Sequence, residues 1–252
     1  SSSADEYEEM NSIDKALSKP ADATIFSIHH QTPALMHALD RANLGTGLVQ
    51  IINSGEAAVV KSGIKANFIG MNDYQAGIMM GRGFSNLHVE QILFVTHLPT
   101  DDMVTIARMA GLKAALPFAN IQMLDISSIP SNKAPAAVSK AIEKNKALDT
   151  IVAVSVHSLD AISEALDLGN SKGTPFKIAT YDLSKHAADL IKSDKVLFTI
   201  DQHPYLQGYY AVVNASLNSD YQIYPNGPVM TGPKIVFAQD IDPIYEHIGV
   251  TR

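Results

Sequence analysis

Polar side chains follow most of the short apolar β-type segments of this chain, at the point where each segment ends. They are Asn53 and Ser54 after residues 48–52, His97 after 91–96, Ser155 after 150–154, Asp182 after 177–181 and Gln202 after 196–200. The carboxyl ends of parallel strands meet at one sheet edge, where open α/β sheets bind their ligands. One such residue alone is more often a cap or turn residue. Their repetition predicts a polar crevice that hydrogen-bonds a small molecule.

Arg108 allows two interpretations. It lies in an apolar stretch, Ile-Ala-Arg-Met-Ala-Gly-Leu, within a predicted helix at residues 101–116. A surface arginine whose stem covers apolar area is the more common situation for such a residue. A functional arginine would instead aim its fork of donors at hydroxyls or a carboxylate in the crevice.

Signatures of catalysis and of metal binding are absent from the sequence. It has no G-x-S-x-G elbow, no Walker A loop, no H-E-x-x-H and no G-x-G-x-x-G, and it has no cysteine. His29 and His30 are adjacent, so on a strand they point to opposite faces and do not easily chelate one ion. His97, His157 and His203 fall at strand ends without carboxylate spacing. We therefore predict no catalytic residue, no metal and no cofactor.

Composition excludes several classes of partner. The chain has 252 residues, 46% hydrophobic and 18% charged, with a net charge of −7 and no basic block. That charge disfavours binding to nucleic acid and to anionic membrane surfaces. No apolar run approaches the roughly 18 residues of a membrane span, so no direct membrane insertion is expected. No signal peptide is present in this sequence, and the lack of cysteine fits an oxidising compartment.

Short apolar segments alternate with longer amphipathic ones along most of the chain. The predicted strands are residues 24–28, 48–52, 91–96, 121–126, 150–154, 177–181 and 196–200. The predicted helices are residues 5–17, 34–43, 73–83, 101–116, 135–146, 158–168, 185–192 and 205–217. Suggested N-caps are Thr100 or Asp101, Ser158 and Ser184, and Pro135 suits a first helical position. This alternation is typical of parallel sheets with right-handed crossovers.

The repetition falls into two blocks, which predicts two doubly wound lobes. The tail from residue 224 is rich in Pro and Gly and then apolar at 234–238, as expected of a final crossing and an edge strand. The chain opens directly in a helix, so the first block has too few strands for a complete lobe. We expect that a βαβ unit of roughly 40 residues is missing at the N-terminus.

Six ordered blocks resemble the sugar-binding, ribose- and galactose-binding-like group of type I periplasmic binding proteins, the substrate-binding proteins of ABC transporters. The blocks are residues 48–55, 69–77, 108–112, 180–184, 200–209 and 230–233. The resemblance implies two α/β lobes joined by a three-strand hinge. The implied lobes are residues 1–71 plus 203–232, which is incomplete, and 72–202 plus 233–252.

The resemblance also implies a function and its residues. A small polar ligand, a sugar or sugar-like molecule, is expected to be captured between the lobes by hinge closure and passed to a membrane ABC permease or a sensor. Ligand contacts are implied for Asn53, Arg108, Ser155, Asp182 and Gln202. Hinge positions are implied for Asn72, Asp73, Asp201 and Gly232. A periplasmic or extracellular monomer is expected.

Two other functions fit the same residues. The same architecture serves as the ligand-sensing domain of repressors and receptor kinases, although a repressor would also need a DNA-binding segment. An enzyme could use Asp182, His157 and Arg108 for acid–base chemistry, but no activated nucleophile or cofactor loop supports that activity.

Overall fold

The computed structural model describes residues 3–30, 37, 47–56, 59 and 66–252, and the chain divides into two compact units. Unit 1 consists of Ser1–Asn72, Asp102–Val104 and His203–Gly232. Unit 2 consists of Asp73–Asp101, Thr105–Gln202 and Pro233–Arg252. The chain thus passes from one unit to the other after residues 72, 202 and 232, and also enters unit 1 for the short segment 102–104.

The described strands of unit 1 form a four-stranded sheet in the order β1-β2-β3-β9, with every neighbouring pair parallel. The strands are β1 (Ala23–Phe26), β2 (Leu48–Asn53), β3 (Ala66–Met71) and β9 (Val229–Gly232). Helix α1 (Ser3–Leu17) contacts β1, and helix α9 (Pro204–Tyr221) contacts β1, β2, β3 and β9.

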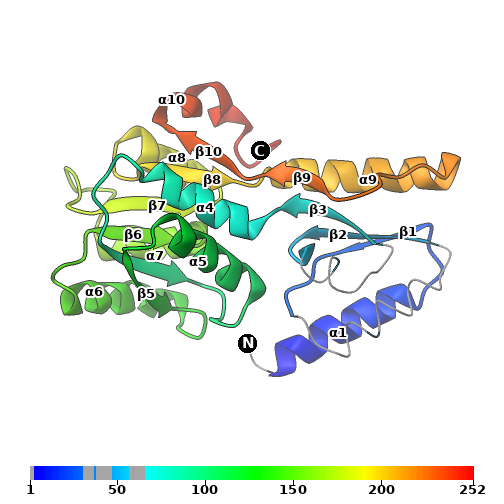
Figure 1. Cartoon of the computed structure of the whole chain (residues 1–252), viewed down its shortest axis with the longest axis horizontal. Coiled ribbons are helices and arrows are strands. Elements are labelled where there is room, and N and C mark those ends of the chain that lie inside the picture. The colour runs from blue at the N-terminus through cyan, green and yellow to red at the C-terminus, as the bar shows by residue number, and fades with distance from the viewer. Residues whose placement is uncertain (1–2, 31–36, 38–46, 57–58, 60–65) are drawn as a thin grey trace. The chain divides into compact units, whose positions relative to one another are not determined.

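Alternation along β2 explains how these two helices cover the sheet. Gln50 points to α9, where its Nε2 donates to the carbonyl oxygen of Ala211 at 2.6 Å. The next residue, Ile51, packs in a core cluster with Ile13 of α1 and Phe68 of β3. Because neighbouring strand residues point to opposite faces, α1 and α9 cover opposite faces of the sheet (Figure 1).

The described strands of unit 2 form a six-stranded sheet in the order β10-β8-β7-β6-β4-β5. They are β4 (Gln91–Thr96), β5 (Asn120–Asp125), β6 (Thr150–Ala153), β7 (Lys177–Tyr181), β8 (Phe198–Asp201) and β10 (Lys234–Phe237). All neighbouring pairs are parallel except the edge pair β10 and β8. The carboxyl ends of β4 to β8 therefore lie at one edge of this sheet.

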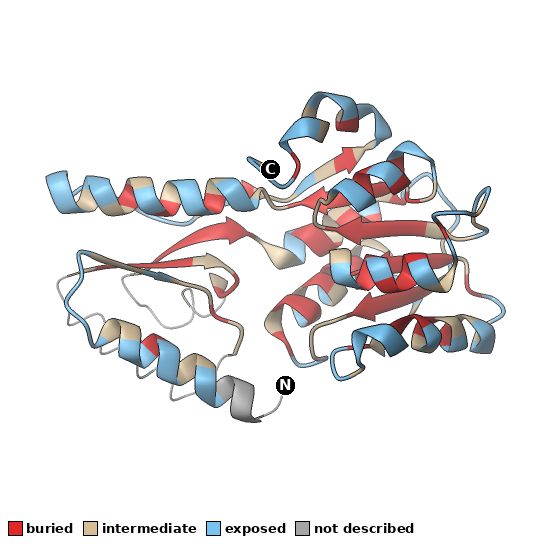
Figure 2. Ribbon diagram, turned by 180° about the vertical axis from the view of Figure 1, so that it is seen from behind, coloured by how far each residue is buried: buried red, intermediate tan, exposed pale blue. Residues whose placement is uncertain are grey.

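Helices cover both faces of the unit 2 sheet. They are α4 (Asp73–Gly83), α5 (Met103–Ala115), α6 (Ala134–Lys144), α7 (Val156–Ala165), α8 (Lys185–Lys192) and α10 (Ala238–Ile241), with 3-10 turns at Ser131–Lys133 and Asp242–His247. Leu93 and Val95 of β4 pack in one core with residues of α6, α7 and α8. On the other face Phe198 of β8 meets Phe84, just after α4, with ring centroids 5.1 Å apart. The inner strands β4, β6, β7 and β8 are accordingly almost fully buried, whereas the edge strands β5 and β10 are partly exposed and the helices expose one side (Figure 2).

The predicted α/β class with mainly parallel sheets is confirmed, and the predicted edge strand near residue 234 is β10. Strand β3 was not among the predicted strands: its six residues include Gly70 and Asn67, which weaken the strand pattern. The predicted helix at 34–43 lies outside the described residues except for residue 37. Within the described ranges, no helix combines the length and apolarity needed to cross a membrane.

Two of the predicted helix caps were wrong, and a third is confirmed. Helix α5 begins at Met103, and Asp102, rather than Thr100 or Asp101, accepts the backbone N–H of Val104 at 2.8 Å. Helix α7 begins before Ser158, and its N-cap is Ser155, whose side chain accepts from the backbone nitrogen of Ser158. Ser184 caps α8 as predicted, accepting from the backbone nitrogen of Ala187 at 3.0 Å.

Helices α4 and α5 pack closely where Gly77 of one helix meets Gly111 of the other, which gives a testable prediction. A Cβ atom on Gly111 would clash with the backbone oxygen of Tyr74 and lie 2.9 Å from the Cα of Gly77. We expect Gly111→Ala to lower the free energy of unfolding by about 1–3 kcal/mol, because rigid backbone must separate. Gly208→Ala, in α9 with nothing within 4 Å of the new carbon, is the matched control and should stabilise by about 0.5–1 kcal/mol. Urea unfolding followed by circular dichroism checks both, and equal stability of Gly111→Ala and the wild type would contradict the close crossing.

Candidate functional site

Arg108 is buried, with 4% of its surface exposed, and its guanidinium is held by three neighbours in unit 2. Its Nε donates to Oδ1 of Asp73 at 2.8 Å, and its Nη1 donates to the carbonyl oxygen of Val154 at 2.7 Å. Its central carbon lies 4.3 Å from the ring centroid of Tyr181, a cation–π arrangement. Arg108 is therefore not a surface arginine whose stem covers apolar area, the more common situation for such a residue.

The surroundings of Arg108 keep it charged. Burial alone lowers the pKa of a guanidinium, but the negative charges of Asp73 and Asp182 outweigh burial, so the pKa of Arg108 is raised. A buried guanidinium with fixed partners is a preorganised donor, because little side-chain freedom is lost when it binds a ligand.

Asp182 stands directly after β7 in a left-handed backbone conformation, with φ of 67°. Its backbone is fixed to the neighbouring strand: its N–H donates to the carbonyl oxygen of Ile200 at 2.9 Å, and its carbonyl oxygen accepts from the Thr199 hydroxyl at 2.6 Å. Non-glycine residues in this conformation are uncommon and concentrate at functional sites. The strand end therefore holds the Asp182 side chain in a defined direction.

The carboxylate of Asp182 accepts a hydrogen bond from Nε2 of Gln202 at 2.6 Å. Burial raises the pKa of Asp182, and Arg108 and the Gln202 hydrogen bond oppose that rise without cancelling it. The structure thus brings Arg108, Asp182 and Gln202, three of the predicted ligand contacts, to one edge of the unit 2 sheet.

Ser155, a fourth predicted contact, lies at the same edge but already uses its hydroxyl. Besides capping α7, its Oγ lies 2.8 Å from Nδ1 of His97. The ring of His97 lies 5.4 Å from that of His157, measured between centroids. Burial, then the charges of His157 and Arg108, lower the pKa of His97 to about 4, so the imidazole is neutral at physiological pH. Whether Ser155 also contacts a ligand stays a prediction.

Asn53, the predicted contact in unit 1, repeats the backbone geometry of Asp182. It ends β2 with φ of 66° and pairs with Gly70 of β3. Its side-chain amide makes no hydrogen bond within the part of the chain that the structure describes. Two predicted ligand contacts, one in each unit, thus occupy left-handed positions at the carboxyl ends of parallel strands.

The predicted hinge residues lie where the chain passes from one unit to the other. Nδ2 of Asn72 donates to Oε2 of Glu56 at 2.7 Å. Asp201 is buried and accepts from Nε of Arg252 at 2.9 Å. Gly232 ends β9 and pairs with Met71. His203, with φ of 52°, has Nδ1 at 2.6 Å from the carbonyl oxygen of Thr231.

Sequence reasoning missed the role of Asp73 in this cluster. Asp73 was interpreted as a hinge residue, and its ion pair with Arg108 links positions 35 residues apart, for which the sequence holds no local signal. Tyr181 lies fully buried beneath the guanidinium, as a core residue of unit 2. Among the described residues no three His, Cys, Asp or Glu side chains are grouped to hold a metal ion.

A family model matches most of this chain. The model described as periplasmic binding protein domain matches residues 1–218, most of the chain. A comparison with curated proteins finds no match.

Solved structures share this fold at low sequence identity. A carbohydrate transporter from Acidothermus cellulolyticus 11B, in complex with myo-inositol, has a TM-score of 0.84 and 21% identity, covering 96% of this chain and 83% of that one. A periplasmic sugar-binding protein of an ABC sugar transporter from Legionella pneumophila has a TM-score of 0.79 and 20% identity, and the match covers 90% of this chain and 83% of that one. A solute-binding protein from Burkholderia graminis C4D1M, in complex with D-arabinose, has a TM-score of 0.78 and 19% identity, and the match covers 93% of this chain and 81% of that one. The chain therefore has the fold of these proteins along nearly its whole length.

Proposed function

The chain belongs to the periplasmic binding protein family, and from that membership we propose that it captures a sugar or sugar-like molecule and delivers it to a membrane ABC permease. Among proteins of this fold are structures in complex with myo-inositol, D-arabinose and D-allose. All three are small, uncharged and rich in hydroxyl groups. The proposed ligand of this chain belongs to the same chemical class.

The observation that carries the proposal is that Asp182 and Arg108 lie at the carboxyl edge of the unit 2 sheet close enough to act on each other electrostatically. A hydroxyl group both donates and accepts, so a polyol needs acceptors and donors at fixed positions. Asp182 supplies charged acceptor oxygens and Arg108 supplies donors, Nη2 above all, since Nε and Nη1 already bind Asp73 and Val154. Charge-assisted hydrogen bonds of this kind are roughly twice as strong as neutral ones.

Two further residues complete the proposed contacts, and a third positions its neighbours. Asn53 of unit 1 has an amide that both donates and accepts, at a strand end with the same backbone geometry as Asp182. Gln202 orients the Asp182 carboxylate and is proposed to contact the ligand as well. Ser155 is proposed to act chiefly by fixing α7 and His97.

The proposed mechanism is closure of the two units on the ligand about the chain crossings near Asn72, Asp201 and Gly232. A polar ligand favours such closure because each hydroxyl left buried without a partner costs about 1–3 kcal/mol. The closed form is then recognised by the permease or a sensor. The protein would act as a monomer outside the cytoplasmic membrane.

A thermal-shift screen tests the proposal. Pentoses, hexoses and polyols are added singly, with a panel of amino acids as the matched set of non-sugar ligands. A sugar present at about a hundred times its dissociation constant should stabilise the protein by about 2.7 kcal/mol and raise its melting temperature. Calorimetry then measures the affinity of each sugar that shifts the transition. A shift with amino acids and with no sugar or polyol would contradict the proposed ligand class.

A further inference from the structure

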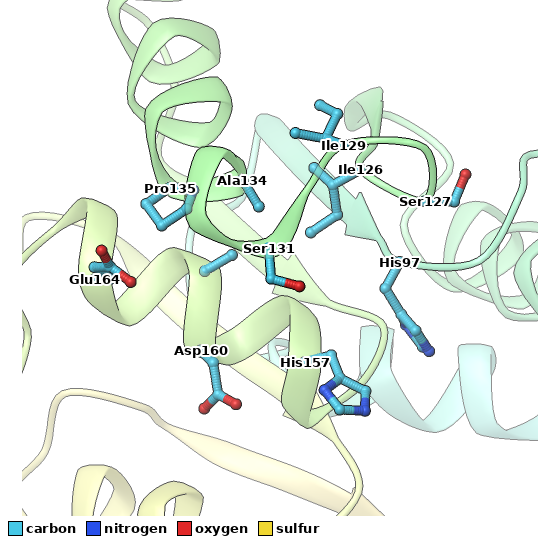
Figure 3. A pocket seen from close by; sticks show the side chains of 11 residues that line it. His97, Ile126, Ser127, Ile129, Ser131, Ala134, Pro135, His157, Asp160 and Glu164 are labelled. Carbon is cyan, nitrogen blue, oxygen red and sulfur yellow. The ribbon is translucent and has the colours of Figure 1, made fainter.

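A pocket of about 450 Å³ lies beside the candidate site in unit 2, and we call it the edge pocket. It lies among α6, α7 and the segments that follow β4 and β5, and its polar lining is His97, Ser127, Ser131, His157, Asp160 and Glu164 (Figure 3). Its volume falls within the range of roughly 300–1,000 Å³ that is typical of small-molecule sites. None of the residues assigned to ligand contact in the proposed function lines it.

The edge pocket adjoins the candidate site through its two histidines. His97 holds the hydroxyl of Ser155 at 2.8 Å, and its ring lies 5.4 Å from that of His157. Arg108 acts electrostatically on His97, and His157 acts on Asp182. A molecule bound to Arg108 and Asp182 would therefore have the imidazole edge of the pocket as a neighbour.

The walls of the edge pocket suit a sugar ring. Ile126, Ile129 and Pro135 form an apolar side, which matches the C–H face of a pyranose. The rest of the lining carries hydroxyl, imidazole and carboxylate groups, which both donate to and accept from sugar hydroxyls. Figure 3 shows the His157 and Asp160 side chains extending from the same side of α7, with Glu164 one turn further along that helix.

The charges of the pocket select against anions. Asp160 and Glu164 contribute two carboxylates to the lining, and His97 is neutral at physiological pH. A phosphate or uronate group would be repelled there, whereas a neutral hydroxylated group would not.

We propose that the edge pocket is a second saccharide subsite, so that the ligand is a neutral oligosaccharide whose first unit binds Arg108 and Asp182 and whose second unit binds among His97, Ser131, His157 and Glu164. This inference rests on the proposed function and extends it from a single sugar to a longer one.

Calorimetry on the full chain tests the subsite. The probes are maltose, cellobiose, lactose and melibiose, their component monosaccharides, and glucose 6-phosphate. At least one disaccharide should bind about tenfold or more tighter than either of its components, because a second ring adds hydrogen bonds and apolar contact. Glucose 6-phosphate should bind no tighter than glucose.

Filling the pocket should remove only the extra affinity. Ser131 is exposed and lies between α6 and α7, so Ser131→Tyr places a ring in the pocket. Affinity for the disaccharide should fall about tenfold while monosaccharide affinity stays within about twofold. Asn132→Tyr, exposed and outside the lining, is the matched control and should change neither. Glu164→Leu, at an exposed helix position, should also weaken disaccharide binding, which keeps the test decisive if Ser131→Tyr misfolds.

The outcomes separate this inference from the proposed function. Monosaccharides that bind as well as every disaccharide, or disaccharide affinity that both pocket variants leave unchanged, would overturn the second subsite alone. If no saccharide of either length binds, the proposed function fails and the subsite fails with it.

Discussion

Replacing Asp182 by alanine is expected to abolish sugar binding, with a loss of affinity of about a hundredfold or more. The physical reason is the loss of a charged acceptor whose hydrogen bonds to sugar hydroxyls contribute about 1.5–3 kcal/mol each. Calorimetry with the tightest sugar found in the screen measures the loss. Unchanged affinity would show that Asp182 is not a ligand contact.

Alanine at this position changes the backbone as well, so Asp182→Asn is the matched variant. The left-handed conformation, with φ of 67°, costs alanine roughly 1–2 kcal/mol, whereas asparagine tolerates it. Asparagine also keeps an oxygen that can accept from Gln202. We expect Asp182→Asn to fold as the wild type does and to bind sugar more weakly, so a binding defect shared by both variants would come from the lost charge.

Although Asp182→Asn should weaken sugar binding, it should raise the stability of the folded protein at neutral pH. Burial raises the pKa of Asp182 above its usual value of 3.8, so the folded protein binds this proton more tightly than the unfolded chain does. Stability contributed at this position is therefore present at acid pH and lost as pH rises from the unfolded to the folded pKa. Asparagine carries no such proton, so above that window Asp182→Asn should melt at a higher temperature than the wild type. Melting curves from about pH 4 to pH 8 check this, and a lower melting temperature at neutral pH would mean that Arg108 outweighs burial.

The strand ends of the candidate site could be predicted because their signal is local. An apolar run followed by a polar residue located the ends of β7 and β8, and therefore Asp182 and Gln202, without any knowledge of tertiary contacts. The order of strands and helices also fixed the α/β class, since alternation leaves few ways to build a sheet. Strand β3 was not predicted because its Gly70 and Asn67 weaken the strand pattern, which extends over only six residues.

The remaining features depend on contacts between distant residues. His97 and His157 were placed at strand ends, but their pairing across 60 positions follows from the neighbouring places of β4 and β6 in the sheet. Ser155 and Ser158 are both acceptable N-caps by type, and the point where β6 ends decides between them. The burial of Arg108 depends on a carboxylate from another helix. Each of these needs the assembled unit, which a pattern along the chain does not describe.

Arg108→Met is expected to lower the free energy of unfolding by about 3–5 kcal/mol, the second large effect. Methionine fills most of the space of the stem but removes the cation that pairs with the Asp73 carboxylate, which is 16% exposed. It also removes the donor to the Val154 carbonyl oxygen and the cation above the Tyr181 ring. Urea unfolding followed by circular dichroism measures the loss. Lys113→Met, at an exposed position of the same helix, is the matched control and should change stability by no more than about 0.5 kcal/mol.

A second substitution separates the ion pair from the packing of the stem. In Asp73→Asn with Arg108→Met, the carboxylate is removed together with the cation that pairs with it, so the double variant should recover part of the stability that Arg108→Met alone loses. The two substitutions should then be non-additive by about 1 kcal/mol or more, as expected for groups in direct contact. Additive losses would mean that Arg108 stabilises unit 2 through Val154 and Tyr181 rather than through Asp73. In that case the pair would matter chiefly for holding the guanidinium in position for the ligand, and the Asp73→Asn variant would lose sugar affinity.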